Sequence, residues 1–319
     1  MTKMLSLIVP AFNEEAVLAE SFAQMDAAMQ ALAGYGYEII YVDDGSRDGT
    51  WPALQALAQA HPQVRALRFS RNFGHQLAVT AGMDAARGDA LIIIDIDLQD
   101  PPAVIPELVA AWEQGADIAY GQRVKREGES LFKRFTAWCY YRLLSAMSAW
   151  PIPLDTGDFR LLDRAVADDF RRMRERDRFL RGMSAWMGYN AVAVPYVRHE
   201  RAAGSTKYSF KKMLRLAMAG ILGFSNRPLT AIGYFGCALA LASLLGLIAA
   251  FVWNGAGWVK AACILALFQA LVMLAQGIQG AYLNRIYDEV RGRPLYIVRE
   301  DTAKNKAAGT GTETKGGYA

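Results

Sequence analysis

The first 125 residues alternate between short apolar segments and longer segments of helical periodicity, and this alternation limits the possible folds more than any other feature. Strands that alternate with helices indicate a mostly parallel sheet covered by helices on both faces. In such sheets, ligands bind outside the carboxyl ends of the strands. We therefore expect a Rossmann-like α/β domain, with strands at residues 5–12, 38–43, 64–70, 90–95 and 117–121 and helices at residues 14–33, 50–60, 75–87 and 102–114.

The sequence IIIDIDLQDPP, residues 92–102, places acidic residues at the end of an apolar strand. In an extended backbone, alternation puts Asp95, Asp97 and Gln99 on one side. Three oxygen ligands suit Mg²⁺ or Mn²⁺, with diphosphate oxygens completing the coordination shell. A solvated acidic loop is the alternative, but two carboxylates at a strand end with no basic neighbour repel each other. The pattern therefore predicts a divalent-cation site.

A second acidic pattern, VDDGSRDGT at residues 42–50, follows the second expected strand. Asp43 or Asp44 could accept hydrogen bonds from a nucleobase or a ribose, as acidic residues at such strand ends do. Turn and capping chemistry would explain the same residues, and both interpretations stay open. No G-x-G-x-x-G follows the first strand and no G-x-x-x-x-G-K-[ST] occurs, so NAD-binding and P-loop functions lose their main support.

The first expected strand ends in VPAFNEE, residues 9–15. We expect Pro10 to end the ladder because proline lacks the N–H that a central strand donates. Asn13 is expected to cap the helix that follows.

Two later stretches, residues 229–252 and 261–283, carry no charged residue. A helix of about 20 apolar residues spans a bilayer core of about 30 Å, so both stretches are long enough to be transmembrane helices. Two buried core helices are the alternative. Basic residues flank the pair and predict that both termini face the cytoplasm; they are Lys211, Lys212, Arg215 and Arg227 before it and Arg285, Arg291 and Arg293 after it.

Amphipathic basic segments lie near these stretches. Residues 209–224 fit a helix at the membrane surface, and residues 126–150 fit either such a helix or a core-facing one. The tail from about residue 301 is rich in Gly, Thr, Lys and Ala and is expected to be disordered. The expected organisation is a catalytic domain (1–200), a juxtamembrane segment (201–228), a two-helix transmembrane hairpin (229–284) and a cytoplasmic C-terminal segment with a disordered tail (285–319).

The net charge indicates which partners the protein binds, and the cysteine content indicates its redox compartment. The net charge is only +4, and most of the basic excess lies near the membrane segments, which suits anionic lipid better than nucleic acid. Only three cysteines occur, so no disulfide framework is expected, as in a reducing compartment.

Taken together, the motifs VPAFNEE, DDGSRDGT and DIDLQDPP at three successive strand ends resemble family 2 glycosyltransferases of the GT-A fold. More narrowly, the chain is similar to polyprenyl-phosphate glycosyltransferases, such as bacterial bactoprenol glucosyltransferases and dolichol-phosphate mannose synthase. Two C-terminal spans fit the bactoprenol type. The resemblance extends to DTGDFRLLDR (155–164), RFLRGMSAWMGY (178–189) and RAAGSTKYSFKKMLRL (201–216).

The resemblance implies a role for particular residues. Asp158 matches the catalytic carboxylate, and Asp97 acts in catalysis through the metal. His75 is interpreted as structural, and Asp100 as the cap of the next helix. The other matched residues are Pro10, Phe12, Glu14 and Asp44 at the nucleotide, Asp95, Asp97 and Gln99 at the metal and diphosphate, and Arg123, Arg134, Arg201 and Lys207 at donor or acceptor phosphates.

The implied reaction moves one hexose, glucose from UDP-glucose, onto undecaprenyl phosphate at the cytoplasmic membrane face, with inversion. UDP-GlcNAc, UDP-galactose and GDP-mannose are alternative donors. A polysaccharide synthase would carry a QxxRW motif, which is absent, and a non-catalytic scaffold would have lost the metal carboxylates. Because a phosphate monoester with a second pKa of about 6 is already largely ionised, the acceptor has less need of a strong base than a hydroxyl acceptor has. Asp158 is therefore either a base or an orienting residue.

Three glutamines predict self-association. Gln269, Gln276 and Gln279 fall on one face of the second expected span. Amides facing lipid are costly, whereas amides facing another helix are satisfied. The first expected span is the alternative partner within the chain, but its polar residues are few. We therefore expect this face to contact a neighbouring subunit, making a homo-oligomer integral to the inner membrane.

Overall fold

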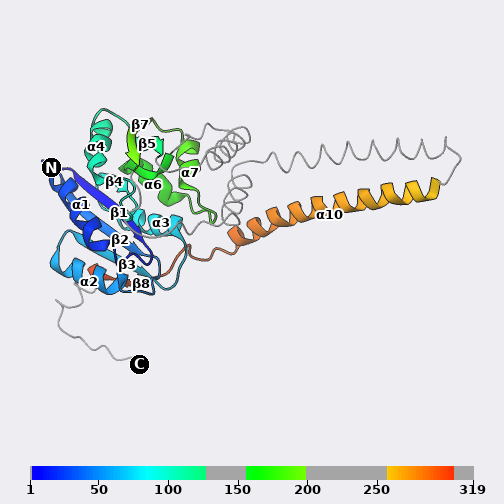
Figure 1. The fold of residues 1–319 in the computed structure, drawn as a ribbon, viewed down its shortest axis with the longest axis horizontal. Helices are drawn as coiled ribbons and strands as arrows, with labels where there is room; N and C mark the ends of the chain where they lie inside the picture. The colour runs from blue at the N-terminus through cyan, green and yellow to red at the C-terminus, as the bar shows by residue number, and fades with distance from the viewer. Residues whose placement is uncertain (1, 127–155, 199–256, 305–319) are drawn as a thin grey trace, which may run out of the picture. The chain divides into compact units, whose positions relative to one another are not determined.

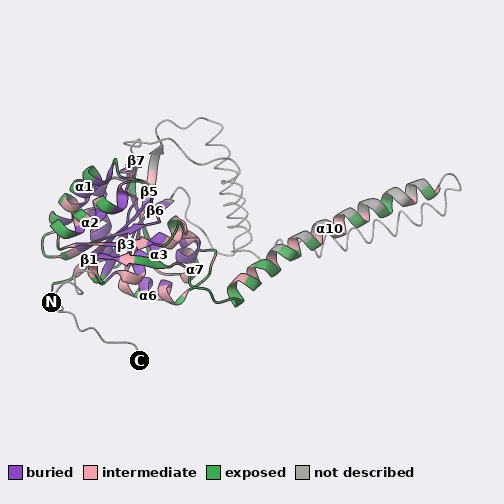
Figure 2. Ribbon diagram, turned by 90° about the horizontal axis from the view of Figure 1, so that it is seen from below, coloured by how far each residue is buried: buried purple, intermediate pink, exposed green. Residues whose placement is uncertain are grey.

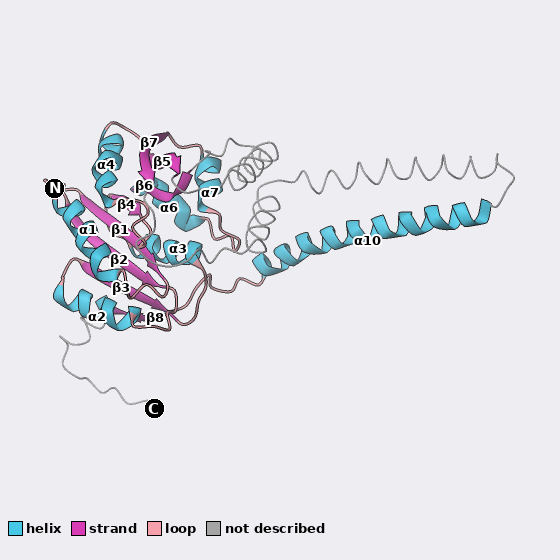
Figure 3. Ribbon diagram, viewed as in Figure 1, coloured by secondary structure: helices cyan, strands magenta, loops and turns pink. Residues whose placement is uncertain are grey.

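The computed structural model describes residues 2–126, 156–198 and 257–304. The chain divides into two compact units. One comprises Met1–Ala137, Ile152–Lys207 and Pro294–Ala319, and the other comprises Trp138–Pro151 and Tyr208–Arg293. The first unit contains all the described strands (Figures 1 and 3).

The first unit is built on an eight-stranded sheet in the order β7-β5-β6-β4-β1-β2-β3-β8. The strands β4, β1, β2 and β3 run parallel, and β7 runs parallel to β5. Strand β6 is antiparallel to β4 and β5, and β8 is antiparallel to β3. The bounds are β1 (Met4–Ala11), β2 (Gly36–Asp43), β3 (Val64–Phe69), β4 (Ala90–Ile93), β5 (Ile118–Arg126), β6 (Thr156–Asp163), β7 (Ala191–Arg198) and β8 (Val298–Asp301).

Helices cover both faces of this sheet, as the alternating sequence predicts (Figures 1 and 2). One face packs against α1 (Leu18–Gln30), α2 (Thr50–Ala60), the short 3-10 helix η1 (Pro102–Val104) and α4 (Ile105–Glu113). The other packs against α3 (His75–Ala85) and α6 (Arg164–Arg172). Helix α7 (Leu180–Met187) lies between β6 and β7 in the sequence. The α/β fold with two helical layers is thereby confirmed, as a mixed sheet of the GT-A-like kind.

Two local expectations for the first strand are wrong. Strand β1 does not end at Pro10 but continues to Ala11, whose carbonyl accepts a hydrogen bond from Asp44 N at 2.9 Å. Asn13 does not cap α1, because Val17 occupies the N-cap position and no side chain caps it. Asn13 instead adopts a left-handed conformation, with φ of 56°.

The second unit includes α10 (Gly257–Val290), a helix of 34 residues that contains the expected span 261–283. Of the helices that the structure describes, none combines the length and the apolar character that crossing a membrane requires. Gln269, Gln276 and Gln279 are all exposed on α10. The expected span 229–252 and the segment 209–224 lie outside the described residues. The segment 126–150 also lies outside them, except for residue 126, which is the last residue of β5.

The C-terminal segment differs from the sequence expectation. Residues 301–304 are ordered rather than disordered, and Asp301 and Thr302 are buried. Strand β8 pairs with β3, and Thr302 Oγ1 accepts a hydrogen bond from Ala66 N at 2.9 Å. Strand β3 would otherwise present unpaired N–H and C=O groups at the sheet edge, and β8 satisfies them.

Candidate active site

The three acidic and polar motifs meet at one edge of the sheet, where the parallel strands β1, β2 and β4 end. The first two are tied together by hydrogen bonds. Asn13 N donates to Ser46 Oγ at 2.9 Å, and Arg47 N donates to Asn13 Oδ1 at 2.9 Å. Gly49 N donates to Glu15 Oε2 at 2.9 Å. The expected gathering of motifs at strand ends is therefore present.

Asp43 and Asp44 are both buried at the end of β2 and both shape the surrounding loops. Asp43 Oδ1 accepts from Ser46 N at 2.9 Å, which closes the turn after β2. Asp44 accepts from Phe73 N at 2.6 Å and from Gly74 N at 2.9 Å, which holds the loop before α3. Burial raises the pKa of each carboxyl, although these hydrogen bonds oppose the rise. The turn chemistry left open by the sequence is thus present.

The other residues expected at the nucleotide lie in or beside β1. Pro10 is buried within the strand, and Phe12 just beyond it is 37% exposed. Glu14 N donates to Thr50 Oγ1 at 2.9 Å, linking this loop to the start of α2. These residues line the same loop cluster as Asp43 and Asp44.

Asp158 on β6 lies at the centre of a polar cluster. Its carboxylate accepts from Gln76 Nε2 at 2.9 Å and from Arg181 Nε at 3.0 Å, and it lies 3.2 Å from His75 Nε2. Although burial acts to raise it, Arg181 and His75 hold the pKa of Asp158 well below its usual range. A carboxylate engaged by three donors is a weak proton acceptor, so the geometry favours an orienting role for Asp158 over that of a base.

His75 joins this cluster to the expected metal motif. Its Nε2 is 3.2 Å from Asp158 Oδ2 and 3.6 Å from Asp95 Oδ1. Burial acts to lower its pKa, but Asp95 and Asp158 together raise it to about 9. From the sequence, His75 is interpreted as structural, and its position between Asp95 and Asp158 is not predicted. The available signal was its place in RNFGHQ, directly after β3 and therefore at the same sheet edge.

Asp95, Asp97 and Gln99 are partly exposed, whereas Ile96 and Leu98 between them are buried. The expected alternation is present, but its expected cause is wrong. Strand β4 ends at Ile93, the chain turns, and Leu98 takes a positive φ of 58°. A turn rather than an extended strand presents the polar side chains.

The charge around Asp95 suits a cation. Burial first, and then the carboxylates of Asp158, Asp100 and Asp97, raise the pKa of Asp95 to about 6 against the opposing effect of His75. This excess of negative charge, with carboxylate and amide oxygens as donors, fits Mg²⁺ or Mn²⁺. No group of three or more His, Cys, Asp or Glu side chains within the described residues forms a ready-made metal site.

Asp100 does not cap the next helix, because Pro101 occupies the N-cap of η1 and no side chain caps it. Asp100 is instead buried, accepts a hydrogen bond from Tyr196 Oη, and lies 3.6 Å from Arg123 Nη2. Arg123 Nε also donates to Tyr196 Oη at 3.2 Å. Arg123 thus belongs to a network beneath the metal motif. The other expected phosphate-binding residues, Arg134, Arg201 and Lys207, lie outside the described residues.

Two further residues of the site were not predicted from the sequence. Gln76 joins two elements, since its Nε2 donates to Asp158 and its Oε1 accepts from Leu180 N at 3.1 Å. Arg181 on α7 contributes the guanidinium that faces Asp158. Arg181 lies in the motif RFLRGMSAWMGY, but only the fold shows what it contacts.

Comparison with known proteins identifies the family. The model of glycosyl transferase family 2 matches residues 6–171. The glycosyltransferase YkcC of Bacillus subtilis (strain 168) is 44% identical, covering 92% of this chain and 93% of its own. The SfII prophage-derived bactoprenol glucosyl transferase of Shigella flexneri is 38% identical, covering 94% and 99%.

A more distant likeness exists among solved structures. Glucosyl-3-phosphoglycerate synthase from Mycobacterium tuberculosis, in complex with Mn²⁺, UDP-glucose and phosphoglyceric acid, is 23% identical over 69% of this chain and 79% of its own, with a TM-score of 0.46. At that distance the likeness says nothing about substrate. The family match and the full-length relatives show that this chain is a glycosyltransferase and belongs to glycosyl transferase family 2.

Proposed function

We propose that the protein transfers one hexose, glucose from UDP-glucose, onto a polyisoprenyl phosphate, undecaprenyl phosphate. The observation that carries the proposal is the relationship to a bactoprenol glucosyl transferase at 38% identity over 94% of this chain and 99% of that one. The cluster of Asp95, His75 and Asp158 at the strand ends supports the proposal as the candidate site of the reaction.

Each part of the cluster has a role in this reaction. Asp95, Asp97 and Gln99 would hold Mg²⁺ or Mn²⁺, which when bound neutralises the diphosphate leaving group. Asp158 orients the sugar or the acceptor while Arg181, Gln76 and His75 fix its carboxylate. The acceptor phosphate attacks in ionised form, because its second pKa of about 6 lies below neutral pH. In-line attack gives inversion at the anomeric carbon.

The acceptor is proposed to approach through the juxtamembrane segment, residues 201–228. Arg201 and Lys207 would neutralise the lipid phosphate, since two anions must come together. Residues 229–284 are proposed to form the transmembrane hairpin in the cytoplasmic membrane, with the catalytic domain and both termini in the cytoplasm. The exposed Gln269, Gln276 and Gln279 on α10 offer a surface to a second subunit of a homo-oligomer.

A donor screen tests this function. The full-length enzyme in detergent is mixed with undecaprenyl phosphate, Mg²⁺ or Mn²⁺, and radiolabelled UDP-glucose, UDP-GlcNAc, UDP-galactose or GDP-mannose in turn. Label is expected to enter the organic phase from UDP-glucose, and only when the lipid phosphate is present. Preference for another nucleotide sugar would reassign the donor, and label in water-soluble polymer would favour a polysaccharide synthase instead.

A further inference from the structure

Strand β8 places the acidic side chain of Glu300 close to the carboxyl end of β2, where the nucleotide is expected to bind. Strand β8 pairs with β3 so that Glu300 lies opposite Arg68 and Asp301 lies opposite Leu67. The segment is bound beyond the strand too, because Ser70 N donates to Ile297 O at 3.0 Å. Alternation along β8 sends Glu300 and Asp301 to opposite faces of the sheet.

Glu300 holds two side chains on the face that α2 covers. One carboxylate oxygen accepts from Trp51 Nε1 of α2 at 3.2 Å, and the other accepts from Arg68 Nη1 at 3.1 Å. The Arg68 guanidinium also lies over the Trp51 ring, with its Cζ 5.6 Å from the ring centroid. Glu300 and Trp51 therefore fix the position of the Arg68 guanidinium.

Arg68 in turn reaches Asp43 at the carboxyl end of β2. Its Nε lies 3.4 Å from Asp43 Oδ2. The Asp43 side chain is fully buried, and within the part of the chain that the structure describes Oδ2 has no hydrogen-bond partner. A buried carboxylate oxygen in that position depends on the nearby guanidinium for compensation of its charge.

We infer that Glu300 is a positioning residue for the donor site: through Arg68 it orders Asp43, so that the C-terminal strand is part of the nucleotide-binding apparatus. The inference rests on the proposed function and on the expectation from the sequence that the nucleotide of the donor binds at Asp43 and Asp44. It gives the segment after α10 a role in donor binding.

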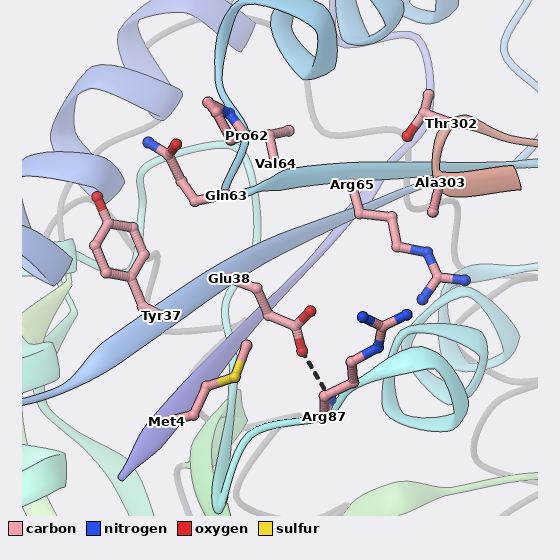
Figure 4. Close-up of a pocket in the computed structure, with 10 residues that line it drawn as sticks. All are labelled: Met4, Tyr37, Glu38, Pro62, Gln63, Val64, Arg65, Arg87, Thr302 and Ala303. Atoms are coloured by element: carbon pink, nitrogen blue, oxygen red, sulfur yellow. Dashed lines mark hydrogen bonds between the residues drawn. The ribbon is translucent and has the colours of Figure 1, made fainter. Parts of the chain in front are cut away.

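A second ion pair on the same two strands provides a matched control. Asp301 accepts two hydrogen bonds from Arg65, at 3.2 and 2.8 Å. Arg65 also donates to Ala85 O at the end of α3, which lies on the opposite face from α2 and Asp43. Arg65 there lines a cavity of about 260 Å³ with Glu38, Arg87 and Thr302 (Figure 4). Removing this pair weakens β8 without touching Arg68.

The test compares the full-length wild type with the variants Glu300→Ala, Glu300→Gln and Asp301→Asn. For each protein, the affinity for UDP is measured by titration calorimetry in the presence of Mn²⁺, and the melting temperature is measured separately. We expect Glu300→Ala to weaken UDP binding about three- to tenfold, since the Glu300–Arg68 pair is partly exposed and acts through a second residue. Glu300→Gln keeps one acceptor oxygen and should lie between wild type and Glu300→Ala. Asp301→Asn should lower the melting temperature and leave UDP affinity unchanged.

The outcomes separate the inference from the function beneath it. Unchanged UDP affinity in Glu300→Ala, with normal wild-type binding, overturns the positioning role and leaves the proposed function standing. Equal losses of affinity in Glu300→Ala and Asp301→Asn also overturn it, because β8 would then act only by general stabilisation. If Glu300→Ala does not purify as folded protein, Glu300→Gln decides by the same criterion. A wild type that binds neither UDP nor GDP refutes the proposed function, and the donor role of Asp43 falls with it.

Discussion

Gly45 is the position where a single methyl group should do the most damage to the site. It lies in the turn after β2 with φ of 74°, and a Cβ placed there would come 2.6 Å from the carbonyl carbon of Arg71 and 2.8 Å from Asn72 N. Both obstructing atoms are backbone, so no side-chain rotation relieves the clash. In Gly45→Ala the loop carrying residues 71–74 must move.

The cost has two parts. An L residue in the left-handed region costs about 1–2 kcal/mol. Moving the loop also strains the bonds from Phe73 N and Gly74 N to the Asp44 carboxylate, at 2.6 and 2.9 Å, and a hydrogen bond to a charged group contributes about 1.5–3 kcal/mol. Together these give a loss of about 2.5–5 kcal/mol in the free energy of unfolding.

Gly34→Ala supplies the control, because Gly34 has φ of 94° but a Cβ there meets nothing within 4 Å. Only the conformational part remains, about 1–2 kcal/mol. Thermal denaturation followed by tryptophan fluorescence should show a shift of about 2–4 °C per kcal/mol, so the Gly45→Ala shift should be at least about twice that of Gly34→Ala. Gly45→Ala should also lose transfer activity, since His75 directly follows the displaced loop. Equal melting shifts in the two variants would refute this reasoning.

Three further predictions follow from the same contacts. Asp97→Asn should abolish transfer with the melting temperature retained, and EDTA should silence the wild type until Mg²⁺ or Mn²⁺ is restored; full activity in EDTA would exclude the metal assignment. Gly82→Ala should destabilise by about 1–3 kcal/mol because its Cβ would lie 2.3 Å from Ile8 Cγ2, and the double variant with Ile8→Ala, measured in denaturant, should lose less than the sum of the single losses. Burial acts to raise the pKa of Asp301, but its bonds to Arg65 lower it below the usual value. The Asp301 carboxylate therefore stabilises the fold at pH values above its unfolded pKa, and this stabilisation is lost as pH falls through its folded pKa. The melting-temperature gap between wild type and Asp301→Asn should therefore be full at neutral pH and shrink below about pH 4; a gap that stays constant would contradict the assigned pair.

Local pattern was sufficient for the parallel half of the fold. The expected helix at residues 50–60 has the bounds of α2, and four expected strands pair in parallel as β4, β1, β2 and β3. Strand β8 could not be predicted in this way. It is four residues long, and its pairing depends on the open edge that β3 presents in the folded sheet.

The site shows the same division between local and tertiary information. The strand-end rule located Asp95 and Asp97, because their surroundings are set by the strand that precedes them. It did not reveal that Gln76 bonds to Asp158, which lies 82 residues away and reaches the same sheet edge through the antiparallel β6. The cap role expected for Asp100 was wrong for a related reason, because the residue that bonds to Asp100 is Tyr196, which lies 96 residues away in the sequence.

The central claim is that a single sugar is attached to an existing lipid phosphate. Mass spectrometry of the lipid after incubation of the full-length enzyme with UDP-glucose, undecaprenyl phosphate and a divalent cation tests it most directly. The account predicts one product, which is heavier than the acceptor by a single hexose residue and still contains one phosphate group. One UDP should be released for each lipid consumed. A lipid diphosphate, a ladder of several hexoses, or hydrolysis of UDP-glucose with the lipid unchanged would contradict it.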